Sequence, residues 1–202
     1  MVIRLRTLPA KQLGLKNMQE ENRQHYFSNP FPIFDFHPNY LLREQTRTDA
    51  PHFLEYYNDA DVSQYILAEI PSTLLAAEHE IQYCRSLFYN KTGLYWSLAL
   101  KPSNIMIGAI GYYMRSDHEA EICFDLHKKH WGQGIMSRAL TPVIDFGKHA
   151  MKLKLISAIT LADNVASSNL LLKHGFHHEK TLRQHRYFKG RFHDVERYIR
   201  HL

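Results

Sequence analysis

The segment 119–151 shows the sharpest change of hydrophobic period in the chain. From Glu119 to His127, apolar and polar residues alternate, which predicts a strand with one apolar face and one polar face. From Met136 onward, apolar and small residues recur at helical spacing. They are Ala139, Leu140, Val143, Gly147 and Ala150. The segment therefore predicts a strand, a short loop and a long helix, and the other predicted elements are arranged around it.

The hydrophobic pattern of the remaining chain predicts further helices and strands. The first predicted strand covers residues 39–47, and predicted helices begin near Pro51, Asp59 and Pro71. A short helix is predicted from Asn164 to Leu172, and further strands over 94–100, 106–114, 155–161, 176–186 and 191–200. This order predicts an α/β fold, with helices on both faces of a central, mixed and twisted sheet.

Two regions depart from the regular pattern. Residues 1–37 combine basic positions, a polar stretch and an Asn-Pro-Phe-Pro sequence that breaks any helix. We expect an N-terminal extension there, packed on the domain or partly disordered, followed by one domain over 38–202. Pro142 falls inside the long helix, where it removes one backbone hydrogen bond. Because the apolar stripe continues beyond Pro142, we expect a kink and not the end of the helix.

The loop between the central strand and the long helix contains Gly132 and Gly134. A helix that begins directly after such a loop directs unpaired N–H groups and a positive dipole end at one point, which suits a phosphate or pyrophosphate. Two glycines before a helix also occur in ordinary turns. Ser137 stands where the dinucleotide-binding fingerprint needs a third glycine, and no Gly-Lys-Ser/Thr follows, so neither that fingerprint nor a P-loop is present.

Composition narrows the class of protein. The net charge of +5 favours anionic ligands, which include coenzyme phosphates as well as RNA. The 14 histidines show no HExxH motif and the two cysteines no zinc spacing, so no metal site is predicted. Cys84 and Cys123 fall at apolar positions and are interpreted as buried thiols. Without a signal-peptide pattern or a membrane-spanning run, we expect a cytoplasmic protein that does not enter a membrane.

The strand, glycine loop and helix resemble the acetyl-CoA-binding segment of the GNAT (Gcn5-related) N-acetyltransferase superfamily. The sequence WGQGIM is similar to the branch that acetylates the N-termini of ribosomal proteins, although Trp131 and Met136 depart from the ends of the common pattern. The resemblance implies the GNAT acyltransferase fold and acetyl-CoA as co-substrate. It also implies that the strand backbone at Phe124 and Leu126 faces the acyl group. The implied coenzyme-binding loop is Trp131, Gly132, Gln133, Gly134, Ile135, Met136 and Ser137.

A second segment carries the same resemblance. Asn164-Val165-Ala166-Ser167, followed by LLKHGF, is similar to the family's Asn-x-x-Ser and Leu-x-Lys-x-Gly-Phe sequence. The resemblance implies that Asn164 contacts the pantetheine arm and that Ser167 can protonate the leaving thiolate. Asn164 is equally a preferred N-cap residue, and the two roles are compatible. Serine is also common in the first turn of a helix, which is the structural alternative for Ser167.

Glu121 is the candidate base. It lies on the polar side of the central strand, and the family branch tends to place its acidic residue at the matching position. An amine must lose a proton to attack a thioester, and a carboxylate can accept that proton directly or through water. The alternative is a solvated carboxylate at the surface. Glu119 and Asp125 lie on the same face and are the next candidates.

The acceptor is left open by the sequence alone. The resemblance favours the α-amino group of a protein or peptide, with a ribosomal protein as the first candidate. Its rivals are a small amine, such as an antibiotic or a polyamine, and a noncatalytic RNA-, ribosome- or CoA-binding domain. The C-terminal segment 183–200 interleaves basic and aromatic residues, and we interpret it as a hairpin that closes an acceptor groove without nucleic-acid readout. Both a monomer and a homodimer fit the sequence.

Overall fold

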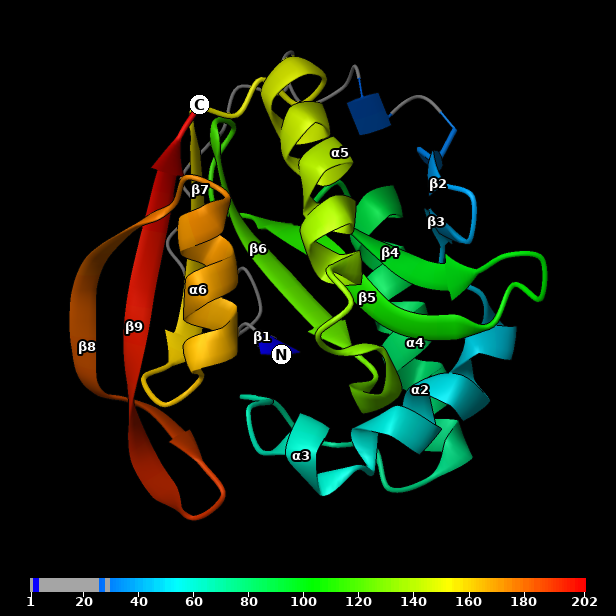
Figure 1. Cartoon of the computed structure of the whole chain (residues 1–202), viewed down its shortest axis with the longest axis horizontal. Helices are drawn as coiled ribbons and strands as arrows, with labels where there is room; N and C mark the ends of the chain where they lie inside the picture. The colour runs from blue at the N-terminus through cyan, green and yellow to red at the C-terminus, as the bar shows by residue number, and fades with distance from the viewer. Residues whose placement is uncertain (1, 4–25, 28–29) are drawn as a thin grey trace.

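The computed structural model describes residues 2–3, 26–27 and 30–202, and its strands join in one mixed sheet (Figure 1). The strands are β1 (Val2–Ile3), β2 (Phe34–His37), β3 (Tyr40–Glu44), β4 (Gly93–Leu100), β5 (Met106–Met114), β6 (Glu119–Leu126), β7 (Leu155–Leu161), β8 (His177–Phe188) and β9 (Arg191–His201). Their order is β2-β3-β4-β5-β6-β7-β9-β8, and β1 pairs with β6 outside this path. Only β6 and β7 run parallel among the paired strands; the other pairs in the described chain are antiparallel.

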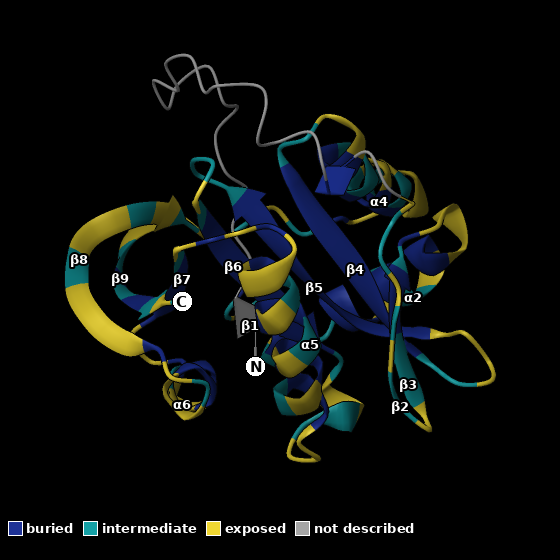
Figure 2. Ribbon diagram, turned by 90° about the horizontal axis from the view of Figure 1, so that it is seen from above, coloured by how far each residue is buried: buried dark blue, intermediate teal, exposed yellow. Residues whose placement is uncertain are grey.

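Helices cover both faces of this sheet, as the sequence predicted. The α-helices are α2 (Ala50–Tyr57), α3 (Ala60–Ser63), α4 (Leu74–Tyr89), α5 (Ile135–His149) and α6 (Val165–Lys173), and the 3-10 turns are η2 (Arg47–Asp49) and η3 (Lys128–His130). One hydrophobic cluster joins α5 and α6 to the sheet, and a second joins α2 and α4 to its other face. Figure 2 shows β4, β5 and β6 as buried strands between these layers, with the yellow side of α5 facing solvent.

The central strand β6 is buried on both faces, which corrects the predicted polar, solvated face. Ile122 and Phe124 pack in the cluster with α5, whereas Cys123 packs in the cluster with α2 and α4. Glu121 and Asp125 share the side of Cys123 and are 4% and 0% exposed. The alternation therefore distinguishes two buried faces. Polar residues can lie on the second face because Asp125 accepts hydrogen bonds and Glu121 forms an ion pair there.

Local chemistry fixes the helix boundaries close to their predicted positions. Thr73 caps α4 by accepting a hydrogen bond from the amide of Ala76, and Asn164 caps α6 by accepting one from Ser167. The long helix α5 continues through Pro142 to His149, so the proline does not end it. The strand predicted over residues 39–47 is shorter in the structure, where β3 covers Tyr40–Glu44.

The N-terminal region contributes directly to the sheet. Phe34–His37 form β2, which pairs with β3, although the sequence analysis placed residues 1–37 in an extension. Phe34 packs its ring near Trp96 and Phe146, with ring centroids 5.6 Å from each. A strand of only four residues that is interrupted by a bulge has too weak a period to be found from sequence. The other calls on residues 4–25 and 28–29 lie outside the described residues.

The sheet opens between its two parallel strands. β6 and β7 pair only over Glu119–Glu121 and Leu155–Ser157, after which the two strands separate. β1 lies in this opening, where Val2 pairs with Asp125 and Ile3 with Phe124 (Figure 1). The functional residues predicted from the sequence gather around this opening and along the loop that follows β6.

Candidate active site

The glycine loop takes the conformation that its sequence requires. Gly132 and Gly134 have φ values of +73° and +69°, in the left-handed region where side chains are strained. Gly134 is the N-cap of α5, so the first amides of a 15-residue helix point out of its end without intrahelical partners. The indole Nε1 of Trp131 donates to the Leu126 carbonyl at 2.7 Å, and Arg138 donates to the Gln133 carbonyl at 2.9 Å. These two bonds brace the loop against β6 and α5.

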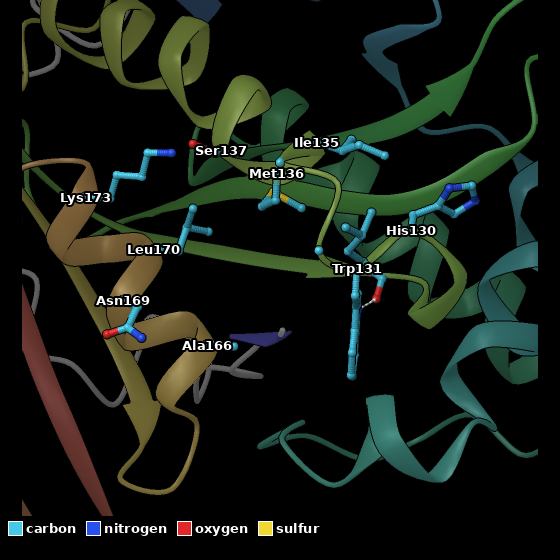
Figure 3. Close-up of a pocket in the computed structure, with 12 residues that line it drawn as sticks. His130, Trp131, Ile135, Met136, Ser137, Ala166, Asn169, Leu170 and Lys173 are labelled. Carbon is cyan, nitrogen blue, oxygen red and sulfur yellow. Dashed lines mark hydrogen bonds between the residues drawn. The ribbon is translucent and has the colours of Figure 1, made fainter.

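A cleft of about 330 Å³ lies between this loop and α6 (Figure 3). The predicted coenzyme-binding residues that line it are Leu126, Trp131, Gly132, Gly134, Ile135, Met136 and Ser137. Three other predicted residues do not line it. Phe124 lies in the core, and Asn164 is buried at the start of α6. The side chain of Gln133 bonds back to the Lys129 carbonyl at 3.0 Å.

The opposite wall of the cleft was missed by the sequence analysis. It consists of one face of α6, with His130 added beside the loop. The α6 residues are Ala166, Asn169, Leu170 and Lys173, which Figure 3 shows across the cleft from Ser137 and Trp131. Their spacing of three and four residues is the period of one helix face. This spacing could have identified the second wall from the sequence, once the glycine loop had been assigned to the coenzyme.

The basic side chains near the cleft are mostly paired with carboxylates or favoured in their neutral form. Lys128 pairs with Asp61, and Lys129 Nζ lies 3.7 Å from Glu55 Oε1, so the lysines of η3 bridge to α2 and α3. Ser137 Oγ lies 2.9 Å from His174 Nε2 and links α5 to the end of α6. Burial lowers the pKa of both His130 and His174, and nearby positive charges lower it further. The neutral forms of these imidazoles are therefore favoured beside the cleft.

Ser167 lies directly behind the cleft wall. It is fully buried, whereas its neighbour Ala166 lines the cleft. The Asn164 side chain accepts the Ser167 amide at 3.3 Å, which is the N-cap interaction expected for that asparagine. The structure thus brings Asn164 and Ser167 together at the start of α6, next to the opening between β6 and β7.

Glu121 lies at the point where β6 and β7 separate. It is 4% exposed, and its Oε2 accepts a hydrogen bond from the Arg115 guanidinium at 2.7 Å. Its second oxygen, Oε1, is buried and has no hydrogen-bond partner in the described part of the protein. One oxygen is therefore held by an ion pair while the other remains available to accept a proton or a water molecule.

The two neighbouring carboxylates are engaged differently. Asp125 is fully buried and accepts hydrogen bonds from the hydroxyls of Tyr56 at 2.6 Å and Tyr57 at 3.1 Å. Glu119 pairs with Arg197 at 3.2 Å. Asp125 thus fixes α2 to β6, and Glu119 fixes β6 to β9. Of the three carboxylates, Glu121 combines burial at the opening with an oxygen that accepts no hydrogen bond from a described residue.

A larger groove of about 790 Å³ is lined by residues other than those of the cleft. One wall is the segment 67–70, and the other is the free end of the β8–β9 hairpin. Lys189 Nζ donates to the Ser63 carbonyl at 3.2 Å, which ties the hairpin to the end of α3. Tyr187 and Phe192 pack edge to face with ring centroids 5.1 Å apart and are 66% and 59% exposed. The end of the hairpin therefore forms one wall of this groove. That the groove takes the acceptor, as the sequence analysis expected, stays a prediction.

The strand β1 occupies part of the predicted coenzyme site. It pairs with the backbone of Phe124 and Asp125, on the edge of β6 that the resemblance assigns to the acyl group. In Figure 3 the short blue ribbon of β1 lies between the loop and the start of α6. A ligand that hydrogen-bonds to the same β6 backbone must displace β1, because each N–H group donates to one strong acceptor at a time.

Comparison with known proteins decides the family. The family model described as an acetyltransferase (GNAT) domain matches residues 39–177 of the chain. The chain belongs to the GNAT acetyltransferase family. The uncharacterized N-acetyltransferase YoaA of Bacillus subtilis (strain 168) is 31% identical over 170 residues, which are 83% of this chain and 96% of that protein. The chain is therefore an acetyltransferase, as the resemblance implied.

Solved GNAT structures share the fold at lower identity. RimL, the ribosomal L7/L12 alpha-N-protein acetyltransferase, superposes with a TM-score of 0.75 at 22% identity, covering 87% of this chain and 97% of RimL. The microcin C7 self-immunity acetyltransferase MccE, in complex with acetyl-CoA and AMP, gives 0.72 at 16% identity, with 86% and 98% covered. These likenesses confirm the GNAT fold, and the two proteins are named for different activities, N-terminal acetylation of a ribosomal protein and microcin self-immunity.

Acetyl-CoA is the co-substrate of this GNAT enzyme. The residues of the cleft fit it, because Gly134 at a φ of +69° places no side chain beside the first amides of α5, which lack intrahelical partners and suit a pyrophosphate. The apolar lining from Leu126, Ile135 and Leu170 suits an uncharged arm. Among the described residues, no group of three or more His, Cys, Asp or Glu side chains could hold a metal ion. Within the same residues, no helix has the length and apolar character needed to span a membrane.

Proposed function

We propose that this GNAT enzyme acetylates the α-amino group of a protein or peptide N-terminus, with a ribosomal protein as the first acceptor to test. The observation that carries the proposal is the groove between the segment 67–70 and the β8–β9 hairpin. Its volume of about 790 Å³ exceeds the 330 Å³ of the coenzyme cleft, and its exposed aromatic side chains suit the first residues of a peptide.

The chemistry of the amine favours the same acceptor class. An α-amine has a pKa of about 7.7–8.0, whereas a lysine amine titrates near about 10.4. A substantial fraction of an α-amine is therefore neutral near pH 7, so a single buried carboxylate can serve its reaction. Glu121 is such a carboxylate, held by Arg115 at 2.7 Å.

We assign roles to three parts of the site. The loop Gly132–Ser137 binds the pyrophosphate through the amides at the start of α5. Glu121 accepts a proton from the acceptor amine, directly or through one water molecule. Ser167 protonates the departing thiolate and is placed by its bond to Asn164. When bound, acetyl-CoA supplies an activated acetyl group, and the backbone amides of 124–126 stabilise negative charge on its carbonyl oxygen.

The known structures support two acceptor classes. RimL is named for the N-terminus of a ribosomal protein, which is the acceptor proposed here. MccE, by contrast, is named for microcin self-immunity and contains AMP as well as acetyl-CoA. The size of the groove in this chain favours a peptide acceptor. The following experiment compares it with the alternative, a small amine.

The experiment measures kcat/KM for different amines at saturating acetyl-CoA. The acceptors are peptides that begin with Ala or Ser, the same peptides with a blocked N-terminus, polyamines and aminoglycosides. We expect the free peptides to be preferred and the blocked peptides to be inactive, because only the α-amine reacts. A higher kcat/KM for any small amine than for every peptide would refute the acceptor while leaving the acetyltransferase assignment intact.

A further inference from the structure

The end of the β8–β9 hairpin carries positive charge without matching carboxylates. The segment 183–192 contains several basic residues and neither Asp nor Glu. The basic residues are Arg183, Arg186, Lys189 and Arg191. The next carboxylate along the chain, Asp194, is already engaged, because it accepts a hydrogen bond from the Arg183 guanidinium at 2.6 Å. The other three basic side chains form no ion pair with any residue that the structure describes.

Two of these three side chains, Arg186 and Lys189, line the groove proposed for the acceptor. Lys189 Nζ donates to the Ser63 carbonyl at 3.2 Å, a contact that holds the amine in place without neutralising its charge. Arg186 is half-buried, and its buried Nε has no hydrogen-bond partner among the described residues. A guanidinium only donates hydrogen bonds, and a buried donor without a partner costs free energy that an acceptor group in the groove can recover.

Packing places this groove beside the opening of the sheet. Leu67 lines the groove and shares a hydrophobic cluster with Ile159 and Leu161, which lie in the part of β7 that has separated from β6. Glu121 pairs in register with Ser157 of the same strand. Because alternate residues of a strand share one face, Ile159 and Leu161 lie on the side of the sheet that Glu121 faces. A peptide in the groove therefore approaches the opening from the side of the proposed base.

A carboxylate is the group that best matches the guanidinium in this groove. The planar fork of an arginine donates two parallel hydrogen bonds to the two oxygens of a carboxylate, and such charged pairs are stronger than neutral ones. The apolar lining from Leu67, Ile70 and Phe188 suits the neighbouring side chains of a peptide more than the phosphates of RNA. Polyamines and aminoglycosides are cations, which the uncompensated charges of Arg186 and Lys189 repel.

We propose that Arg186 is a specificity-determining residue, which binds a carboxylate of the acceptor peptide, so that the enzyme prefers N-termini followed closely by Asp or Glu. The proposal rests on the proposed function, because it takes the groove as the acceptor site. It narrows the substrate class to acidic N-terminal segments. Arg186 binds and orients the peptide and takes no part in proton transfer, whereas Lys189 adds to the positive charge of the same wall.

The first test compares peptides that all begin with Ala and differ in one residue, which is Asp, Asn or Lys at the second to fifth positions in turn. At the best position we expect kcat/KM for the Asp peptide to exceed that for the Asn peptide by about 10- to 10²-fold, the effect of one charge-assisted hydrogen bond. The difference should lie mainly in KM, because the contact is made before and during the reaction. Arg186→Gln should abolish it.

Two further variants separate recognition from folding. Arg186→Glu should reverse the preference, so that the Lys peptide becomes better than the Asp peptide, and a misfolded enzyme cannot gain a new preference. Arg191→Gln is the matched control, because Arg191 is an exposed arginine of the same hairpin that does not line the groove. It should keep the wild-type preference. CoA affinity, measured by calorimetry, should be the same in all three variants.

Binding without turnover decides the remaining outcomes. Calorimetry with the N-terminally acetylated forms of the same peptides should show tighter binding of the Asp peptide that Arg186→Gln removes. Equal kcat/KM for Asp and Asn at every position, or an Asp preference that survives in Arg186→Gln, would overturn the proposal. Tighter binding of an RNA oligonucleotide than of any acidic peptide, lost in Arg186→Gln, would also overturn it.

Failure of the proposed function gives a different result. A wild-type enzyme that acetylates no peptide but binds the acetylated Asp peptide through Arg186 would refute the acceptor class and leave the carboxylate site standing. Absence of both peptide acetylation and Arg186-dependent binding would refute the two proposals together.

Discussion

The proposed coenzyme cleft and the proposed acceptor groove are lined by different kinds of groups. The cleft is made largely of backbone and apolar side chains, from the Gly132–Ser137 loop and one face of α6. The groove is made of aliphatic, aromatic and charged side chains from the segment 67–70 and the end of the β8–β9 hairpin, which lie far apart in the sequence. The loop of the cleft is braced by hydrogen bonds to β6 and α5, whereas the groove aromatics Tyr187 and Phe192 remain exposed.

The difference implies two modes of recognition. The coenzyme would be bound mainly by backbone groups, and the acceptor mainly by side chains. Amides at a helix end and a left-handed glycine recognise a pyrophosphate through the backbone, so many side-chain changes there leave binding intact. Recognition of an acceptor depends on the side chains that line the groove, and these differ freely among enzymes with one fold. Substitutions in the two regions should therefore alter different kinetic constants.

The largest effect is expected for Glu121→Gln. Loss of the base should lower kcat by about 10²–10⁴-fold, the usual contribution of such a group, while CoA affinity stays nearly unchanged. Steady-state kinetics and calorimetry measure the two quantities. Glu119→Gln is the matched control, since Glu119 is also paired with an arginine on the same face of β6. A loss of less than about threefold for Glu121→Gln, far below that range, would move the role to Asp125, Glu119 or a chain of water molecules.

The next effect is expected in the cleft. Gly134→Val adds a branched side chain at a φ of +69° and narrows the end of α5 beside Arg138. We expect CoA affinity to fall by at least about tenfold, which corresponds to about 1.4 kcal/mol. Gly190→Val is the control, because Gly190 has a similar φ of +77° in the distant hairpin turn. Undiminished CoA binding by a folded Gly134→Val enzyme would show that the pyrophosphate binds elsewhere.

A smaller loss is expected for Ser167→Ala. The thiol of CoA has a pKa near that of free cysteine, about 8.5, so water can protonate its thiolate when the serine is absent. We expect kcat to fall by less than about tenfold, below the usual range for acid–base groups. Ser168→Ala, one residue further along α6, is the control. A loss as large as that of Glu121→Gln would mean that Ser167 has a role beyond protonating the thiolate.

The smallest effect concerns β1, which lies at the border of the two regions. Deleting Val2 and Ile3 removes the strand that pairs with Phe124 and Asp125. CoA should then bind about a few-fold more tightly, by the inverse of the fraction of time that β1 leaves the β6 edge free in the full chain. Calorimetry with the shortened and full chains measures this change. Weaker binding after the deletion would mean that β1 supports the coenzyme site instead of competing for it.

The sequence by itself determined the central part of this protein. The strands 106–114 and 155–161 and the turn at Lys189-Gly190 were predicted as they are found. The positive φ values of Gly132 and Gly134 agree with the glycine loop read from the sequence. These features follow from local rules, because hydrophobic period, glycine conformation and N-cap chemistry act within a few residues.

Only the tertiary structure decided the environments of the polar residues. Alternation along β6 could not reveal that its second face is buried, because the partners of Glu121 and Asp125 come from Arg115, Tyr56 and Tyr57. The α6 wall of the cleft, the place of β1 in the opened sheet and the position of Arg186 likewise depend on contacts between distant segments. Burial and charge are properties of such contacts, so a local pattern cannot specify them.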